Sequence, residues 1–338
     1  MTSRNKRSGA RGGRVTKLKG VVASYAPVMG AVATLAVAGA LGLSSANAAC
    51  TDTPTMARAN GGDNCTAAGS NYTNGGNGTS YTTGLQPVFA TQASTLTLSA
   101  PLVTVVATAP ATDPATQGSL AVNAYLDSTI HFLGDVDVAV GGNPNSRGFY
   151  AENSPGSGLA SIIVDGNASI HRDVDGAYSA MGIDSTNRSF VSVGGDVSVT
   201  GYLSKGLNAR GAGTIIIGGN AEILLTSMSP YSTVGGAVTS GMSGVGDAIQ
   251  DYSLVHIKGD LKVEAARGAG LYAQGNLNNS IIVNGKLNVK SPGNGIQALN
   301  GGKIFIDPSA DATSGDLELP VKVELRADLQ RKYGSAMQ

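Results

Sequence analysis

The chain has 338 residues, of which 48 are glycine and none is tryptophan, and it carries 23 basic and 23 acidic side chains. Seven of the basic residues lie within the first 19 positions, where no acidic residue occurs, so the remainder holds 16 basic against 23 acidic residues, a net charge near −7. This balance excludes the basic footprint of a nucleic-acid-binding protein.

Residues 1–48 have the pattern of a secretory signal peptide. The basic segment Met1–Lys19 precedes the uncharged, small and apolar run Ala26–Leu43, and Ser45-Ala46-Asn47-Ala48 then offers an Ala-x-Ala cleavage site. We therefore predict export through the Sec machinery. A retained membrane anchor is one alternative, but the run is rich in Ala and Gly and ends at a cleavage site. A lipoprotein modified at Cys50 is another, but Asn47 stands where a lipobox normally has Leu.

The segment 49–94 is polar, and Thr51–Thr83 is dense in Gly, Asn, Ser and Thr. It contains both cysteines of the chain, Cys50 and Cys65. In an exported protein such a pair is expected to form a disulfide, and closing a loop of this size contributes roughly 3 kcal/mol in the chain-entropy model. A metal site is the rival interpretation, but no histidine or second cysteine pair lies nearby.

A nine-residue pattern occurs six times between Ile130 and Val289: apolar, any, apolar, any, Gly, polar, apolar, polar, apolar. A repeat of this kind predicts a solenoid, and the alternation predicts strands with one buried face. The glycine shares the inward register, so we predict a corner or bulge where a side chain would crowd the core. No helical pattern follows it, which argues against a dinucleotide-binding loop. The six corner glycines are Gly134, Gly166, Gly195, Gly219, Gly259 and Gly285.

A second pattern, usually Gly-apolar-x-Ala, follows each copy of the first. Each period therefore holds two or three short strands and no helix, which predicts an all-β protein: a right-handed parallel β-helix of about seven rungs over residues 95–307. An antiparallel β-sandwich is the runner-up, but it does not require equivalent inward positions in every period. Copies of the second pattern begin at Gly148, Gly182, Gly206, Gly270 and Gly295, and the copy at Ala248-Ile249 is degenerate.

The two long periods are expected to carry loop insertions, 142–158 and 227–247. Binding residues often lie on loops held by a rigid scaffold, so we predict partner contacts there. Tyr231, Tyr150 and Phe149 are the aromatic candidates, with packing inside the rung the better role for Phe149. Repetition ends where Pro308 replaces the glycine, because proline cannot donate a ladder hydrogen bond. Residues 308–338 are predicted to form a C-terminal cap or linker.

No catalytic, cofactor-binding or metal-binding arrangement is predicted. His131 and His256 share one outward position but lie several rungs apart, and His171 belongs to a polar cluster just beyond a strand end. The acidic residues recur by rung, as turn chemistry produces. The alternative is a β-helical polysaccharide lyase or glycoside hydrolase, which needs two or three acids with Arg172 or Arg188 on one face. The candidate acids are Asp135, Asp137, Asp165, Asp173, Asp175, Asp184 and Asp196.

Four features occur together: the extended leader Met1–Tyr25, the Ala-x-Ala site, repeats such as Ile281–Val289, and few cysteines. In this combination the chain resembles the passenger domain of a bacterial autotransporter over about Met1–Asp307. The resemblance implies a β-helix displayed by a C-terminal outer-membrane β-barrel. Only 31 residues follow Asp307, whereas a barrel needs at least eight strands of about ten residues. We therefore expect a barrel that is supplied separately or is missing, so that the chain is a truncated autotransporter or a free exported β-helix.

The predicted function is an adhesion or interaction module without enzymatic activity. Its expected partner is a host or bacterial surface ligand, either a protein or a glycan. Its expected location is the cell surface, the outer membrane or the extracellular space, or the periplasm where no translocator is available.

Overall fold

The chain divides into two compact units, Met1–Ser45 and Ala46–Gln338. A computed structural model describes parts of the second unit: residues 50–73, 85–108, 118–141, 145–154, 158–174, 180–226, 236–241, 252–275 and 279–306. The predicted leader, the segment 308–338 and Tyr231 lie outside these ranges. Within them, no helix is long and apolar enough to cross a membrane.

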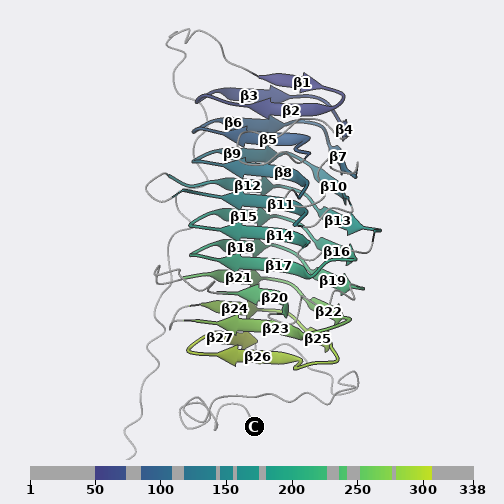
Figure 1. Cartoon of the computed structure of the whole chain (residues 1–338), viewed down its shortest axis with the longest axis vertical. Helices are drawn as coiled ribbons and strands as arrows, with labels where there is room; N and C mark the ends of the chain where they lie inside the picture. Colours follow the sequence, from purple (N-terminus) through teal and green to yellow (C-terminus); the bar gives the residue numbers. More distant parts are fainter. Residues whose placement is uncertain are drawn as a thin grey trace, which may run out of the picture. The chain divides into compact units, whose positions relative to one another are not determined.

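The described residues form three sheets whose strands follow one another along the chain (Figure 1). Sheet A contains, in order, β1 (Thr51–Thr53), β2 (Met56–Ala59), β5 (Val88–Thr91), β8 (Leu120–Tyr125), β11 (Arg147–Glu152), β14 (Met181–Thr186), β17 (Lys205–Arg210), β20 (Gly236–Ser240), β23 (Ala269–Gln274) and β26 (Ile296–Leu299). Sheet B contains β3 (Asn64–Ala67), β6 (Thr95–Leu98), β9 (Thr129–Phe132), β12 (Ser161–Val164), β15 (Phe190–Val193), β18 (Thr214–Ile217), β21 (Leu254–Ile257), β24 (Ser280–Val283) and β27 (Lys303–Ile306). Sheet C contains β4 (Asn71–Thr73), β7 (Leu102–Ala107), β10 (Asp135–Val140), β13 (Ala168–Arg172), β16 (Val197–Gly201), β19 (Ala221–Leu225), β22 (Leu261–Ala265) and β25 (Leu287–Lys290).

The chain is a right-handed parallel β-helix, as predicted. Each rung takes one strand from each sheet and stacks on the next in parallel, while β1 pairs with β2 in the antiparallel direction. The described strands make eight three-stranded rungs and a two-stranded ninth, one complete rung more than expected. Parallel pairing begins at Ala57 in β2 and not at residue 95. The nine-residue pattern does not detect the first rung, because the inward positions of this rung hold mainly small residues such as Ala57 and Ala67.

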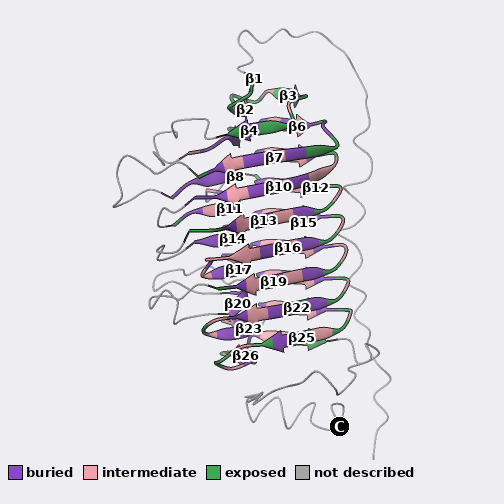
Figure 2. Ribbon diagram, turned by 90° about the vertical axis from the view of Figure 1, so that its right-hand side faces the viewer, coloured by how far each residue is buried: buried purple, intermediate pink, exposed green. Residues whose placement is uncertain are grey.

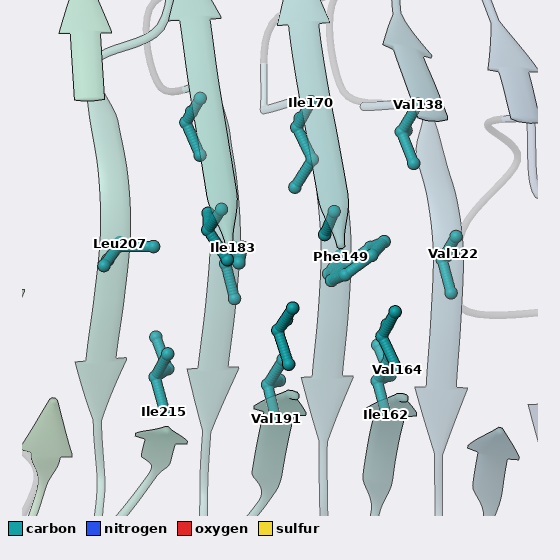
Figure 3. Close-up of a cluster of buried hydrophobic side chains, with 14 of the residues drawn as sticks. Val122, Val138, Phe149, Ile162, Val164, Ile170, Ile183, Val191, Leu207 and Ile215 are labelled. Carbon is teal, nitrogen blue, oxygen red and sulfur yellow. The ribbon is translucent and has the colours of Figure 1, made fainter. Parts of the chain in front are cut away.

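Inward side chains fill the space between the sheets in columns along the stack (Figure 3). Ile162 pairs with Ile130 on one side and with Val191 on the other, and all three are fully buried. Phe149 packs in this core, as predicted, and its ring stacks on Phe132 with centroids 6.2 Å apart. Every rung thus buries equivalent positions, which is what the nine-residue pattern requires.

The corner between sheets A and B uses left-handed backbone. Leu126 and Asp127 have φ of 52° and 60°, and Asn187 and Arg188 have φ of 55° and 61°. Two consecutive residues in this conformation turn the chain sharply, which favours Asn, Asp and Gly. A buried serine follows the turn in several rungs, and the Ser128 hydroxyl donates to the Ala90 carbonyl of the preceding rung at 2.8 Å.

The N-terminal end of the stack is closed by β1. Cys50 and Cys65 form the expected disulfide, which ties the residue before β1 to β3. The Asp52 carboxylate accepts hydrogen bonds from the Ala68 backbone N–H at 2.9 Å and from the Tyr72 hydroxyl at 3.0 Å. These contacts tie β1 to β4 and to the residue that follows β3.

The two expected loop insertions are partly rung structure. Segment 142–158 contains β11, and segment 227–247 contains β20, which pairs with both β17 and β23. The prediction that 227–247 is wholly a loop insertion is therefore wrong, because Val238 is fully buried in the core. The strand β20 also takes the place in sheet A that the sequence assigned to the degenerate copy at Ala248-Ile249, which lies outside the described ranges.

Candidate ligand-binding groove

A groove of about 700 Å³ runs along the outer face of sheet C. This face is turned toward the viewer in Figure 2, with β7 to β25 stacked one above the other. The groove crosses seven strands: β7, β10, β13, β16, β19, β22 and β25. Most of its polar lining comes from two columns of side chains, each with one residue per rung.

The first column is a ladder of Asp and Asn side chains at the corner between sheets B and C, which we call the Asx ladder. In each step the side-chain oxygen Oδ1 accepts a hydrogen bond from the backbone N–H of the next rung. The steps are Asn167 to Asp135 at 2.7 Å, Asp196 to Asn167 at 2.8 Å, Asn220 to Asp196 at 2.6 Å, Asp260 to Asn220 at 2.8 Å and Lys286 to Asp260 at 2.7 Å.

The six predicted corner glycines lie immediately before the residues of this ladder, between sheets B and C. They are half-buried, so the expectation that a side chain would crowd the core is wrong. A Cβ on Gly166 would instead lie 2.2 Å from Asp135 Oδ1, and one on Gly219 would lie 2.2 Å from Asp196 Oδ1. Gly195, Gly259 and Gly285 meet the preceding Asx oxygen in the same way, and Gly134 meets the Pro101 carbonyl. The glycine is required because the preceding rung's side chain occupies that space.

Asp and Asn alternate along the ladder, as Asp135, Asn167, Asp196, Asn220 and Asp260. Adjacent rungs are roughly 4.8 Å apart, so the alternation keeps the carboxylates about 10 Å from one another. That distance is close to the Debye length at physiological salt, beyond which exposed charges are largely screened. The side-chain amide of Asn167 also donates to Asp135 Oδ1 at 3.2 Å. The ladder therefore stacks acidic residues without direct carboxylate–carboxylate contact.

The second column points outward from the strands themselves. It contains Asp137, Ser169, Ser198, Glu222, Lys262 and Asn288. Lys262 Nζ pairs with Glu222 at 2.9 Å, which is the first of the contacts that raise the pKa of this lysine. The hydroxyls of Ser169 and Ser198 have no hydrogen-bond partner among the described residues, so they are free to bind water or a ligand.

The charges of the groove are unevenly distributed. Its lining contains five acidic side chains and two lysines, a net charge of −3. Three of the acids, Asp135, Asp137 and Asp196, lie in the N-terminal half, whereas both lysines, Lys262 and Lys286, lie in the C-terminal half. A ligand along the groove therefore meets a negative potential at one end and a mixed one at the other.

The three histidines lie apart from one another. The sequence pattern predicts this separation for His131 and His256. His131 Nε2 lies 2.9 Å from Asp165 Oδ1 on the face of sheet B, and His171 Nδ1 lies 3.6 Å from Asp137 on sheet C. His256 stands between Ile216 and Ile282 in sheet B and is half-buried, and this burial lowers its pKa. No group of three or more potential metal ligands occurs in the ranges that the structure describes.

Neither of the two arginines considered for polysaccharide cleavage lines the groove. Arg172 is almost fully buried, and its guanidinium donates to the carbonyls of Gly141 at 2.9 Å and Tyr202 at 2.6 Å. Arg188 belongs to a left-handed turn between sheets A and B. Asp173 is exposed beyond β13, and Asp175 lies outside the described residues.

Sheet A holds a buried charge cluster that neither sequence pattern predicts. Arg147 Nε donates to Asp184 Oδ2 at 2.7 Å, Asn208 Nδ2 donates to Asp184 Oδ1 at 2.6 Å, and Arg210 lies 3.6 Å from the same carboxylate. Burial alone would raise the pKa of Asp184, but Arg147 and Arg210 outweigh it and lower the pKa. Aligning the second pattern would have placed Asp184 beside Asn208.

The same cluster changes the role predicted for Tyr150. Its side chain is buried, its ring lies under the Arg147 guanidinium at 4.5 Å, and its hydroxyl donates to Glu152 at 2.5 Å. The prediction that Tyr150 supplies aromatic contact to a partner is therefore wrong. Because Asp184 at its centre is fully buried and its carboxylate is paired with Arg147 and Asn208, we assign the network to stability and not to ligand binding.

Comparison of the chain with protein-family models, with curated proteins and with solved structures gives no match. The proposed function therefore rests on the groove and its lining residues.

The alternation of Asp and Asn predicts the effect of Asn167→Asp. The new carboxylate would stand between Asp135 and Asp196, and we expect the unfolding free energy at neutral pH and low salt to fall by about 1–2 kcal/mol, recovering at high salt. The matched control is Asn288→Asp, because Asn288 is the register partner of Lys262 and gains an opposite charge. Equal losses in both variants, measured by denaturant unfolding, would contradict this account of the ladder.

The sheet A cluster predicts a rise in stability with pH. Burial lowers the pKa of Lys205 from 10.5 to about 8. Between these values the unfolded chain binds a proton that the folded chain has released, so the unfolding free energy increases with pH. Urea unfolding between about pH 8 and the onset of tyrosine ionisation near pH 10 should show the increase. Lys205→Met should remove it, and an unchanged slope in this variant would assign the effect to other groups.

Proposed function

We propose that this protein is an exported β-helix, similar to an autotransporter passenger, that acts as a surface or secreted adhesion module. The groove on sheet C is its contact surface. The observation that supports this is the length of the groove, which crosses seven consecutive strands of a rigid sheet with polar lining residues on every rung from β10 to β25. A solenoid offers an extended surface of this kind because each rung repeats the same positions.

Export to an oxidising compartment outside the cytoplasm would be consistent with this proposal. The disulfide between Cys50 and Cys65 indicates an oxidising environment. The basic leader and Ala-x-Ala site in residues 1–48 support export. Display at the cell surface or release from the cell then brings the groove into contact with a host or bacterial surface ligand.

Filling the groove tests the proposal. Ser169→Ile and Ser198→Ile together place two branched side chains in its floor, and we expect binding to target cells or immobilised surface extracts to fall by about tenfold or more. Ser192→Ile is the matched control, since Ser192 belongs to the same rung as Ser198 but faces outward from sheet B. Isoleucine already occupies that sheet B column at Ile163 and Ile216, so this change should preserve folding.

Equal binding by the groove variant and the control, with both proteins folded by circular dichroism, would exclude the groove as the contact surface. The measurement compares equilibrium binding of the exported chain, so a loss of fold is separated from a loss of contact.

A polysaccharide lyase or hydrolase is the second candidate, because the groove holds carboxylates on one outward face. Against it, the described residues lining the groove include neither Arg nor His, and Arg172 is buried elsewhere. Release of reducing sugars from pectin-like polysaccharides, abolished by Asp135→Asn or Asp196→Asn, would favour the enzyme over the adhesion module.

A further inference from the structure

We propose that the groove on sheet C binds an extended glycan chain that is neutral or carries amino groups, laid along the axis of the β-helix. This inference rests on the proposed function and names the ligand class of the same site. Four properties of the groove carry it: its length, its free hydrogen-bonding groups, its charge and the absence of aromatic side chains among its described lining residues.

The groove is long and its polar groups recur at a fixed interval. Six strand spacings of about 4.8 Å separate β7 from β25, which gives a length of ~29 Å. The Asx ladder and the second column present one polar side chain each to every rung between β10 and β25. An extended pyranose chain advances by roughly one strand spacing per ring, so successive rings meet equivalent groups along the groove.

The lining keeps hydrogen-bonding capacity that the fold does not use. Each aspartate of the ladder engages its Oδ1 atom with the next rung, and no hydrogen bond to Oδ2 of Asp135, Asp196 or Asp260 occurs among the described residues. The hydroxyls of Ser169 and Ser198 are free as well. Solvent satisfies these groups in the free protein, and sugar hydroxyls replace water with hydrogen bonds of the same type.

The charge of the groove selects among glycans. Five carboxylates against two lysines disfavour a polyanionic chain. The N-terminal half, with Asp135, Asp137 and Asp196 and no lining cation, attracts amino groups instead. A neutral chain binds through the hydroxyl and amide groups, and an amino-bearing chain gains electrostatic attraction at this end.

A peptide partner fits the groove less well. The strands β7 to β22 each pair with a neighbouring strand on both sides, and only β25 lies at the edge of the described sheet. A peptide therefore cannot add as a strand within the groove. Protein interfaces depend on buried aromatic and apolar anchors. Among the described residues that line the groove there is no aromatic side chain; Leu261 is buried, Leu287 is half-buried, and Leu102 at the β7 end is the one large apolar side chain that is exposed.

The test measures binding of the exported chain to three hexasaccharides by titration calorimetry. The probes are chitohexaose, which is neutral, its deacetylated form, which carries amino groups, and hexagalacturonate, which is anionic. We expect both chito-oligosaccharides to bind and the anionic one to bind at least about tenfold more weakly. Ser169→Ile with Ser198→Ile should weaken chitohexaose binding about tenfold, and Ser192→Ile should leave it unchanged. Asp135→Asn with Asp196→Asn should weaken the deacetylated form more than chitohexaose.

Failure of this inference is distinguishable from failure of the proposed function. If the groove variant loses adhesion but none of the chito-oligosaccharides binds, the contact surface stands and the glycan assignment is overturned. Loss of adhesion after protease treatment of the target surface would then identify a protein partner. Tighter binding of hexagalacturonate than of chitohexaose would overturn the charge argument. If the groove variant changes neither adhesion nor glycan binding, both proposals fail.

Discussion

The structure depends on the hydrogen bond that each Asx side chain receives from the backbone of the next rung. Asp196 Oδ1, for example, accepts from the Asn220 N–H at 2.6 Å, in the space where a Cβ on Gly219 would lie. The glycine and the Asx residue are therefore two halves of one contact between consecutive rungs. In a parallel β-helix, the strand of each rung must begin in register with the equivalent strand of the preceding rung. The glycine–Asx contact fixes this register at the corner between sheets B and C.

The same contact shapes the surface that we propose to be functional. With Oδ1 held by the next rung, the carboxylates line one side of the groove in fixed positions, and the alternation with Asn167 and Asn220 limits their mutual repulsion. Preorganised polar groups of this kind bind a ligand without a large ordering cost. The Asx ladder thus belongs both to the fold and to the contact surface that we propose, whereas we assign the sheet A network around the fully buried Asp184 to stability.

Much of the fold was predictable because strand periodicity is local. Alternation around each central glycine identified inward residues such as Ile162 and Val191, which are fully buried. The strands β2 and β20 were missed because Ala57 and Gly236 give no apolar signal. The reason for the glycines was also missed, because it lies in a contact between residues 24 to 40 positions apart in sequence. The polar residues of the second column could be identified in the sequence. That they line one groove together with the Asx ladder follows only from the register of sheet C.

The unfolding free energy of Gly219→Ala tests the central claim most directly. Its Cβ would displace the hydrogen bond between Asp196 Oδ1 and the Asn220 N–H, leaving both groups to find new partners. We expect a loss of about 2–4 kcal/mol relative to the wild-type chain, whereas Ser198→Ala, on the rung of Asp196, should cost less than about 0.5 kcal/mol. Equal and small losses in the two variants would show that the glycine–Asx contact does not hold the rungs in register.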